Sequence, residues 1–265
     1  MVTDSNFSPD EVGRWLDQLY IASAGATLRA EDKRKAIEVA ALLSEIDRAL
    51  RGLSKARGLT VVDAASGKAY VGLLTAKLVL EAIARPAKVV CIERNPALVA
   101  RTEMAAQTLA STVPITCECA DLSQAGVWPN APALVVALHA CGPASDVIIE
   151  QAVASATRVL LLVPCCVGAG VAKVKDAEAL AEALGVPRTA PVRRRFVHAI
   201  IEADRVLTLE AAGYQTEAVE FVAPTVTPYN TLLRARRVGE PHRVAQAHKA
   251  RLRLWSHSSH VVTPS

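Results

Sequence analysis

Acidic, imidazole and thiol side chains occur at intervals in this sequence, each directly after a short apolar run. Asp63, Glu93 and Asp121 follow the first three of these runs, and His139 and a cysteine pair follow the next two. Such groups can pair with a cation, accept hydrogen bonds from hydroxyls or amines, move a proton or bind a metal ion. The full set is Asp63, Glu93, Asp121, His139, Cys141, Cys165 and Cys166.

The apolar runs alternate with helical patterns, and this alternation predicts the elements that position the reactive groups. Near-continuous apolar strands are typical of a parallel sheet buried on both faces. The predicted fold class is therefore α/β, a Rossmann-like doubly wound sheet of seven strands if the last two form a reversed hairpin. Predicted strands are 59–63, 88–93, 114–119, 133–138, 159–163, 219–222 and 232–235, and predicted helices are 70–84, 95–110, 145–156, 174–185 and 198–212.

The 265 residues divide into a core domain with an extension at each end. Residues 1–57 are predicted to be helical, with a capped start at Ser8-Pro9, and to pack beside the sheet because they are too short to bury a core of their own. Residues 58–238 form the α/β domain. Residues 239–265 are predicted to be a basic, partly disordered tail, unstructured from His257 onward.

In an open parallel sheet, ligands bind beyond the carboxyl ends of the strands, so the strand ends predict a binding site. The small-residue turn after the first strand lets a backbone approach a ligand closely. Asp63 has a competing role as a helix cap, Asp121 as a turn residue, and Arg94 as a solvated neighbour. The predicted cofactor-binding residues are Asp63, Ala65, Ser66, Gly67, Lys68, Glu93, Arg94, Asp121, Leu122 and His139.

The acids restrict the kind of ligand. A phosphate at the first two strand ends is disfavoured by repulsion, and the chain has no Gly-Lys-Ser/Thr phosphate loop because Ala69 follows Gly67-Lys68. The turn also lacks the Gly-x-Gly-x-x-Gly spacing of nicotinamide-dependent oxidoreductases. S-adenosylmethionine fits better: its amino group and sulfonium suit the first acid, its ribose the second, and its adenine amine the third.

Five segments, in order, resemble a known family and cover roughly residues 30 to 238. The chain resembles class I S-adenosylmethionine-dependent methyltransferases of the methyltransferase domain 32 branch, which includes the eukaryotic tRNA acceptor-stem ribose methylase. The resemblance implies S-adenosylmethionine as cofactor and favours RNA as methyl acceptor. The segments are Arg34-Lys35-Ala-Ile-Glu38, Asp63-Ala-Ala-Ser-Gly-Lys-Ala-Tyr70, Leu138-His-Ala-Cys-Gly-x-x-x-Asp146, Pro164-Cys-Cys166 and Thr227-Pro-Tyr-Asn-Thr-Leu-Leu-Arg-Ala235.

Ala65 and Ala69 replace two glycines of the family pattern. An alanine is tolerated there if its φ angle is negative, and costs about 1 kcal/mol or more if φ must be positive. Cofactor binding is weakened in the second case.

His139 is the predicted general base, oriented by Asp146, and a loop-bonding role for His139 is the alternative. His139 with Cys141, Cys165 and Cys166 offers zinc ligands by type, but adjacent cysteines rarely aim both thiols at one ion, so no metal is predicted. Reduced thiols are expected rather than a disulfide framework. Cys117 and Cys119 are expected to be small buried hydrophobes.

The acceptor is less well defined than the cofactor. Two basic segments, 193–195 and 234–253, are either a phosphate-binding face or solvated surface, and few aromatic side chains are evident for stacking bases. RNA is the preferred acceptor. A small-molecule or protein acceptor, and a catalytically inactive RNA-binding module, remain alternatives. The sequence has neither a membrane-spanning apolar run nor a signal-peptide pattern at its start, so a cytoplasmic location is expected.

Overall fold

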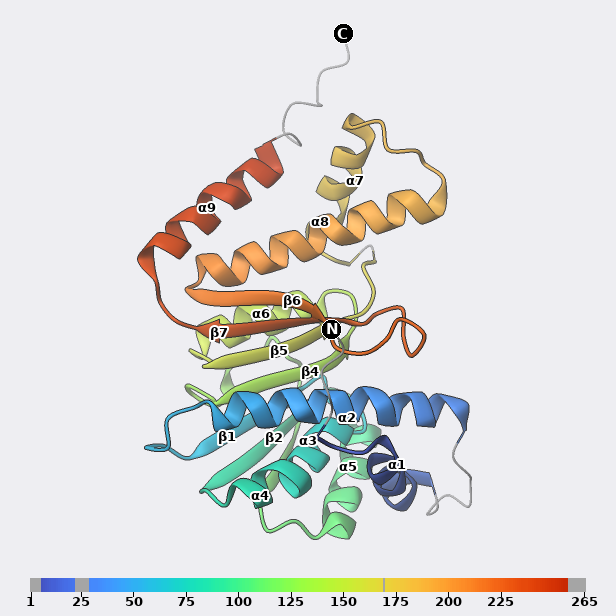
Figure 1. The fold of residues 1–265 in the computed structure, drawn as a ribbon, viewed down its shortest axis with the longest axis vertical. Coiled ribbons are helices and arrows are strands. Elements are labelled where there is room, and N and C mark those ends of the chain that lie inside the picture. Colours follow the sequence, from blue (N-terminus) through green and yellow to red (C-terminus); the bar gives the residue numbers. More distant parts are fainter. Residues whose placement is uncertain (1–5, 22–28, 169, 257–265) are drawn as a thin grey trace.

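The computed structural model describes residues 6–21, 29–168 and 170–256. Its strands form one sheet in the order β3-β2-β1-β4-β5-β7-β6, in which β7 runs antiparallel to β5 and β6. The predicted α/β fold, with a reversed hairpin as the last two strands, is confirmed (Figure 1). The strands are β1 Leu59–Ala64, β2 Ala87–Glu93, β3 Ile115–Cys119, β4 Leu134–Ala140, β5 Val159–Pro164, β6 Tyr214–Glu220 and β7 Thr231–Arg237.

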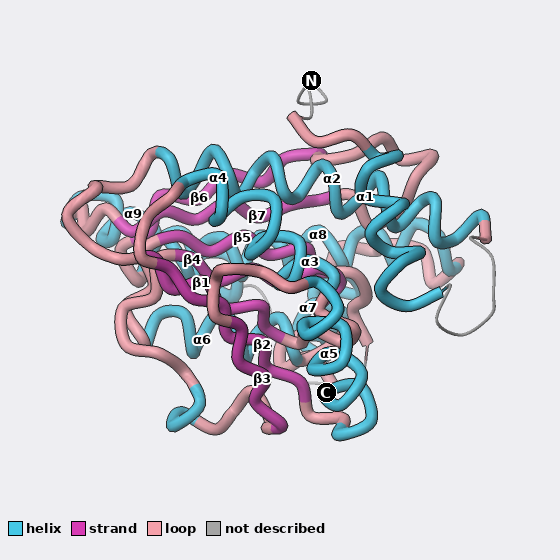
Figure 2. Tube along the Cα trace, turned by 90° about the horizontal axis from the view of Figure 1, so that it is seen from below, coloured by secondary structure: helices cyan, strands magenta, loops and turns pink. Residues whose placement is uncertain are grey.

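Helices flank the sheet on both sides, as a view from the perpendicular direction shows (Figure 2). α3, Tyr70–Leu74, continues through a π-helical stretch, Thr75–Leu80, into α4, Glu81–Ile83, so the predicted helix 70–84 is one continuous element. The others are α1 Pro9–Leu16 with a π-helical turn Asp17–Ile21, α2 Ala30–Arg51, α5 Pro96–Leu109, a 3-10 turn Ala125–Val127, α6 Ala144–Ala154, α7 Val174–Ala183, α8 Ala190–Ala211 and α9 Pro241–Ser256.

Alternate residues along the central strands face opposite layers of the core. Val61 and Val89 face one layer, together with residues of α2, α3 and α5, whereas Val62 and Val90 face the other, together with residues of α6 and α8. Because side chains alternate across a strand, a run apolar at every position is buried on both faces. The continuous apolar runs of β1, β2, β4 and β5 have this cause.

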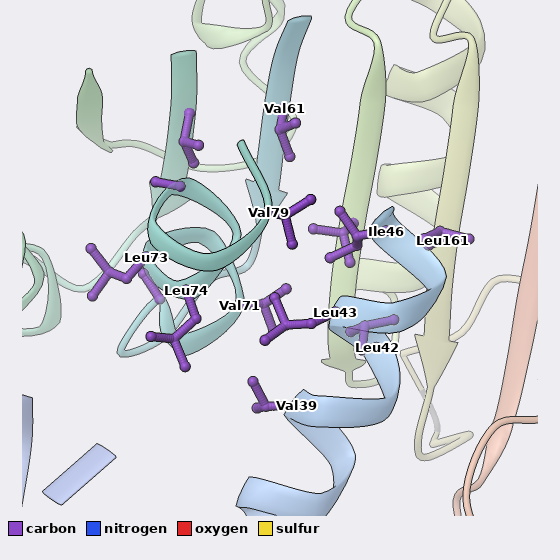
Figure 3. Packing of buried hydrophobic residues seen from close by; sticks show 14 of the residues in the cluster. Val39, Leu42, Leu43, Ile46, Val61, Val71, Leu73, Leu74, Val79 and Leu161 are labelled. Atoms are coloured by element: carbon purple, nitrogen blue, oxygen red, sulfur yellow. The ribbon is translucent and has the colours of Figure 1, made fainter. Parts of the chain in front are cut away.

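The amino-terminal helices pack on the sheet, as predicted. The Ser8 hydroxyl accepts a hydrogen bond from the amide of Asp10 and caps α1 at the predicted start. α2 presents Val39, Leu42, Leu43 and Ile46 to the sheet and to α3, as Figure 3 shows. These positions are spaced three and four apart, so one face of the helix is apolar. The extension therefore shares the core of the α/β domain.

The carboxyl-terminal third differs from the prediction in two elements. The helix expected at 198–212 begins eight residues earlier, at Ala190, with a proline in its first turn. β6 begins at Tyr214 rather than 219, because it is an edge strand in which only Tyr214 is buried and the apolar signal is weak. The arginine triplet 193–195, which lay between two predicted helices, thus lies on α8.

The basic, partly disordered tail predicted for residues 239–265 contains an element that the sequence analysis did not predict, at residues 241–256. These residues form α9, which packs along α8 and buries Ala247 (Figure 1). Asp204 of α8 holds α9 by accepting hydrogen bonds from Arg251 Nε and Trp255 Nε1, both at 2.7 Å. The segment from His257 lies outside the described residues. Among the helices described, none combines the length and the apolar character needed to cross a membrane.

Candidate active site

The predicted site residues gather at the carboxyl edge of the sheet, where the strand order reverses between β1 and β4. Two clefts meet there and share Ala65 and His139. One, of about 410 Å³, is lined by Glu93, Arg94, Asp121, Leu122 and Cys141 among others. The second, of about 500 Å³, is lined by Asp63, Ser66, Gly67, Lys68 and Lys35 among others. The structure thus brings the predicted cofactor-binding residues together at the position where open α/β sheets bind ligands.

The turn after β1 is tied to β2. Gly67 has φ +58°, and its amide donates to Glu93 Oε2 at 2.9 Å, while the amide of Ser66 donates to the carbonyl of Ile92 at 3.0 Å. Ser66 Oγ is buried and has no hydrogen-bond partner among the described residues. A buried hydroxyl without a partner costs free energy, so this atom is suited to a polar ligand in the cleft.

Asp63 is buried, with 2% of its surface exposed, and joins β1 to the first turn of α3. Its Oδ2 accepts a hydrogen bond of 2.8 Å from the amide of Gly72. A Cβ at position 72 would lie 2.8 Å from Cys91 Sγ and 3.0 Å from Oδ2 of Asp63, so only glycine fits. Burial raises the pKa of Asp63 from 3.8 to about 7, the Gly72 hydrogen bond opposes this, and the charge of Glu93 adds to it.

The other two acids are held by local hydrogen bonds. Glu93 Oε1 accepts a hydrogen bond from the amide of Asn95 at 2.9 Å, while its other oxygen, Oε2, accepts from the amide of Gly67. Asp121 Oδ1 accepts from the amide and hydroxyl of Ser123, at 2.9 and 2.7 Å, and these bonds lower the pKa of Asp121. The predicted turn role of Asp121 is therefore present, and its position in the cleft is present as well.

Lys68 is fixed by the amino-terminal extension. The Tyr20 hydroxyl donates to the Lys68 carbonyl, and the Lys68 ammonium lies 5.7 Å from the ring centres of both Tyr20 and Tyr70. The two rings meet edge to face at 5.0 Å. Burial raises the pKa of Tyr20, so its hydroxyl stays protonated and serves as a donor.

His139 pairs with Glu38, the last residue of the first family-like segment, to which the sequence analysis assigned no role. Its Nε2 lies 2.9 Å from Oε1 of Glu38 on α2, and Lys35 Nζ lies 2.6 Å from Oε2 of the same carboxylate. Glu38 is 4% exposed. Burial alone would raise the pKa of Glu38, but the hydrogen bonds from His139 and Lys35 hold it below its ordinary value. The available signal was the family-like segment Arg34-Lys35-Ala-Ile-Glu38, which ends at this acid within the apolar stripe of α2.

The prediction that Asp146 orients His139 is wrong. Asp146 Oδ1 accepts from Arg205 Nε at 2.7 Å, and Arg205 also donates to the carbonyl of Gly142 at 3.4 Å. Arg205 is a buried residue of α8, with 3% of its surface exposed. Without Asp146, the buried charge of Arg205 would have no counter-ion. Asp146 thus fastens the loop after β4 to α8, and His139 relies on Glu38.

The cysteines also differ from the prediction. A disulfide joins Cys141, after β4, to Cys165, after β5, against the expectation of reduced thiols. Cys166 remains free, with its Sγ 3.8 Å from that of Cys165. Cys117 is only half-buried and Cys119 is exposed, because β3 is an edge strand with a partly open face.

Ala65 and Ala69 both have positive φ angles, 54° and 49°. The backbone at the two positions is therefore the one that the family pattern fills with glycine. Each alanine places a Cβ in the left-handed region at a cost of roughly 1–2 kcal/mol. His139 also has φ +60°, at an irregularity in the pairing of β4 with β5. The turn after β1 and the end of β4 thus both carry backbone strain.

The sheet order, the reversed hairpin and the acids beyond β1 and β2 define the class of Rossmann-like methyltransferases. Residues 34–171 match a family model described as a methyltransferase domain, Methyltransf_32. The match covers more than half of the chain, and the chain belongs to this family. It is an S-adenosylmethionine-dependent methyltransferase.

Known structures share the fold at low sequence identity. The magnesium protoporphyrin IX methyltransferase of Synechocystis PCC 6803, solved with bound SAH, is 17% identical, with 87% of this chain and 100% of that chain covered and a TM-score of 0.48. The citrinin polyketide synthase CMeT domain is 11% identical, with 79% and 54% covered and a TM-score of 0.50. A putative class I methyltransferase from Listeria monocytogenes is 12% identical, with 88% and 69% covered and a TM-score of 0.49. A comparison with curated proteins finds no match.

The raised pKa of Asp63 predicts a pH-dependent stability. Since the folded state favours the protonated carboxyl, the stabilisation is complete below the unfolded pKa and is lost as the pH rises through about 7. The free energy of unfolding should fall between about pH 4 and pH 7, relative to Asp63→Asn, by a few kcal/mol at most. Denaturant titrations of both proteins over this range measure the difference. A difference that stays constant with pH contradicts the assignment.

Because the turn after β1 is strained, two alanine-to-glycine substitutions should have opposite effects on the free energy of unfolding. Ala65→Gly should raise the free energy of unfolding by about 0.5–1 kcal/mol, because relief of the left-handed strain exceeds the entropy cost of glycine. Ala100→Gly, on the exposed face of α5, is the control and should lower it by about 1 kcal/mol. Urea unfolding compares the two. A destabilised Ala65→Gly protein would show that the turn is not strained.

Proposed function

We propose that this methyltransferase transfers the methyl group of S-adenosylmethionine to a nucleophilic atom of RNA bound at the carboxyl edge of the sheet. The observation that carries the proposal is an exposed basic and aromatic surface at this edge, formed by Arg194 and Arg195 of α8 and by Tyr229. The ordered motifs shared with a branch that includes a tRNA methylase support the same acceptor.

The cofactor role of each strand-end acid is part of the proposal. Ionised Asp63 faces the amino group and sulfonium, Glu93 the ribose hydroxyls and Asp121 the adenine amine. Ser66 Oγ, buried without a partner among the described residues, supplies a further polar contact. Ala65, Gly67 and Lys68 offer backbone at close approach, and Arg94 and Leu122 line the neighbouring cleft.

His139 is the proposed base. Since a carboxylate only accepts hydrogen bonds, the Glu38 contact places the proton of a neutral His139 on Nε2 and the lone pair on Nδ1. When bound, S-adenosylmethionine would supply an electrophilic methyl group and a thioether leaving group. The proton of the acceptor passes to Nδ1 of His139. Glu38 is then a positioning residue, which holds the imidazole and stabilises its protonated form.

The length of α8 places its first turns beyond the sheet. α8 ends next to the start of β6 and runs antiparallel to it, and its 22 residues span about 33 Å. The seven residues of β6 span about 23 Å. The amino-terminal turns of α8 therefore extend past the carboxyl edge by roughly 10 Å, and they carry residues 193–195.

The arginines of the two basic segments differ in whether acids of the protein already pair with them. Arg193, Arg234, Arg243 and Arg251 are engaged by acids of the protein itself. Within the described ranges, neither Arg194 nor Arg195 forms an ion pair, and both are exposed. The segment 193–195 is thus a better phosphate-binding candidate than 234–253, whose first residues lie at the opposite edge of the sheet.

An aromatic side chain lies on the same edge. Tyr229 belongs to the segment between β6 and β7, is 42% exposed, and lies against the ring of His198 on α8 with 6.3 Å between ring centres. Unpaired bases stack on such rings. Asn230 of the same motif is buried and donates to the carbonyl of Val222 at 2.9 Å, so it holds the segment in place.

The test begins with calorimetric titration of S-adenosylmethionine, followed by transfer of labelled methyl groups to RNA pools. Arg194→Ala/Arg195→Ala should reduce kcat/KM for RNA roughly tenfold and lower the salt dependence of RNA binding by about two phosphate contacts, with cofactor affinity unchanged. Arg236→Ala/Arg237→Ala, at the opposite edge, is the matched control.

Three results would change the proposal. Labelling of protein or small molecules but not RNA identifies another acceptor class. RNA binding without methyl transfer to any pool, despite cofactor binding, favours an inactive RNA-binding module. Equal effects of the two double variants on RNA methylation would remove the assignment of the α8 surface.

The Glu38–His139 pair predicts non-additive kinetics. Glu38→Gln should lower kcat by about 10²-fold while the KM for S-adenosylmethionine stays constant, because the imidazole loses its charged partner. The double variant Glu38→Gln/His139→Ala should be no slower than His139→Ala, since Glu38 acts only through the imidazole that His139→Ala has already removed. Glu45→Gln, a buried acid of the same helix paired with Arg234, is the control and should leave kcat unchanged. Additive losses would contradict the pairing.

A further inference from the structure

Three cysteines from the ends of two neighbouring strands converge beside the clefts. The Sγ atoms of Cys141, Cys165 and Cys166 all lie within 4.8 Å of one another. Cys141 and Cys165 have Cα atoms 5.4 Å apart and share the disulfide, and Cys166 Sγ is 3.8 Å from Cys165 Sγ. The proposed methyl transfer uses none of these thiols.

The backbone around the three sulfurs is held in place. The amide of Gly142 donates to the carbonyl of Cys166 at 3.1 Å, which ties the loop after β4 to the segment after β5. Gly142 has φ +58°, and its own carbonyl accepts from buried Arg205. The three sulfurs therefore converge on a braced backbone, as ligands of a pre-organised site do.

Cys165 and Cys166 can both face one ion although they are adjacent in the chain. Side chains of neighbouring residues point to opposite faces only within a strand. β5 ends at Pro164, and the residues that follow are irregular, so Cys165 and Cys166 turn their sulfurs toward each other. In a tetrahedral site with zinc–sulfur bonds of about 2.3 Å, two thiolates lie about 3.8 Å apart. The observed separation of this pair is 3.8 Å.

We propose that Cys141, Cys165 and Cys166, once the disulfide is reduced, bind one thiophilic d10 cation, of which zinc is the commonest. Reduction by a phosphine or a dithiol adds two electrons and two protons to the disulfide. Binding of the dication by the three thiols then releases three protons and forms three metal–sulfur bonds. Oxidation of Cys141 and Cys165 removes two of the ligands, so the disulfide and metal-bound forms exclude each other.

The fourth coordination position is left to water or a small ligand. Among the described residues, no other histidine, cysteine or acid belongs to this group. Three protein ligands with an open position are typical of reactive rather than purely structural zinc sites. Cys141 also lines the cleft of Glu93, Asp121 and His139, so the cation would lie at the wall of the active site. The site is independent of the identity of the methyl acceptor.

The test uses full-length protein reduced with a phosphine under argon, freed of metal with a chelator, and titrated with Co²⁺ as a spectroscopic probe. We expect one Co²⁺ per chain, with sulfur-to-cobalt charge-transfer absorption and strong tetrahedral d–d bands, and displacement of the Co²⁺ by Zn²⁺. Cys166→Ser should lose the charge-transfer intensity of one sulfur ligand. It should also weaken Zn²⁺ binding by more than roughly 100-fold, the most that is typically lost when a residue that only supports a metal ligand is removed.

Cys119→Ser is the matched control, because Cys119 is an exposed free thiol outside the cluster. Its metal affinity and spectrum should equal those of the unaltered protein. The proposal is overturned if the reduced protein shows no sulfur-to-cobalt band, or if Cys166→Ser binds as tightly as Cys119→Ser. The proposal is also overturned if the reduced protein binds no metal and only re-forms the Cys141–Cys165 disulfide when air is admitted.

Discussion

The hydrogen bond from the Gly72 amide to the buried carboxylate of Asp63 is the constraint on which the candidate active site depends. It joins the end of β1 to the first turn of α3 at a place where a single Cβ would not fit. The turn between them is consequently short, and its amides reach Glu93 and the end of β2. Because the same carboxyl group is buried, its ionised form is unfavourable unless a cation lies beside it. Asp63 is therefore a structural residue of the turn as well as the proposed partner of the cofactor's cationic groups.

The strands and their terminal acids could be predicted because the signal is local. A strand buried on both faces is apolar at each position, and the acid that follows it lies at the sheet edge by topology alone. Glu38 could not be assigned in this way, since its partner His139 is 101 residues distant and only the packing of α2 on the sheet brings them together. The mistaken pairing of His139 with Asp146 has the same origin, as Arg205 arrives from α8.

Helix α9 and the edge strand β6 show a second limit of sequence patterns. α9 has a polar composition, and the contacts that attach it to α8 include the hydrogen bonds of Asp204 with Arg251 and Trp255 and the ion pair of Arg243 with Glu210. Such contacts leave little hydrophobic periodicity to detect. β6 is buried at only one residue, Tyr214, whose hydroxyl donates to the carbonyls of Ala152 and Thr157. Polar attachment, rather than an apolar face, defines both elements.

The contact between Tyr20 and the Lys68 carbonyl bears on where the catalytic unit ends. The family match begins at residue 34 and stops at 171, yet the turn after β1 is held by a tyrosine before that range. Beyond the range, Leu232 and Leu233 complete the two layers of the core. The matched segment therefore lacks part of the core and the tyrosine that holds the turn, so we expect residues 34–171 alone not to fold.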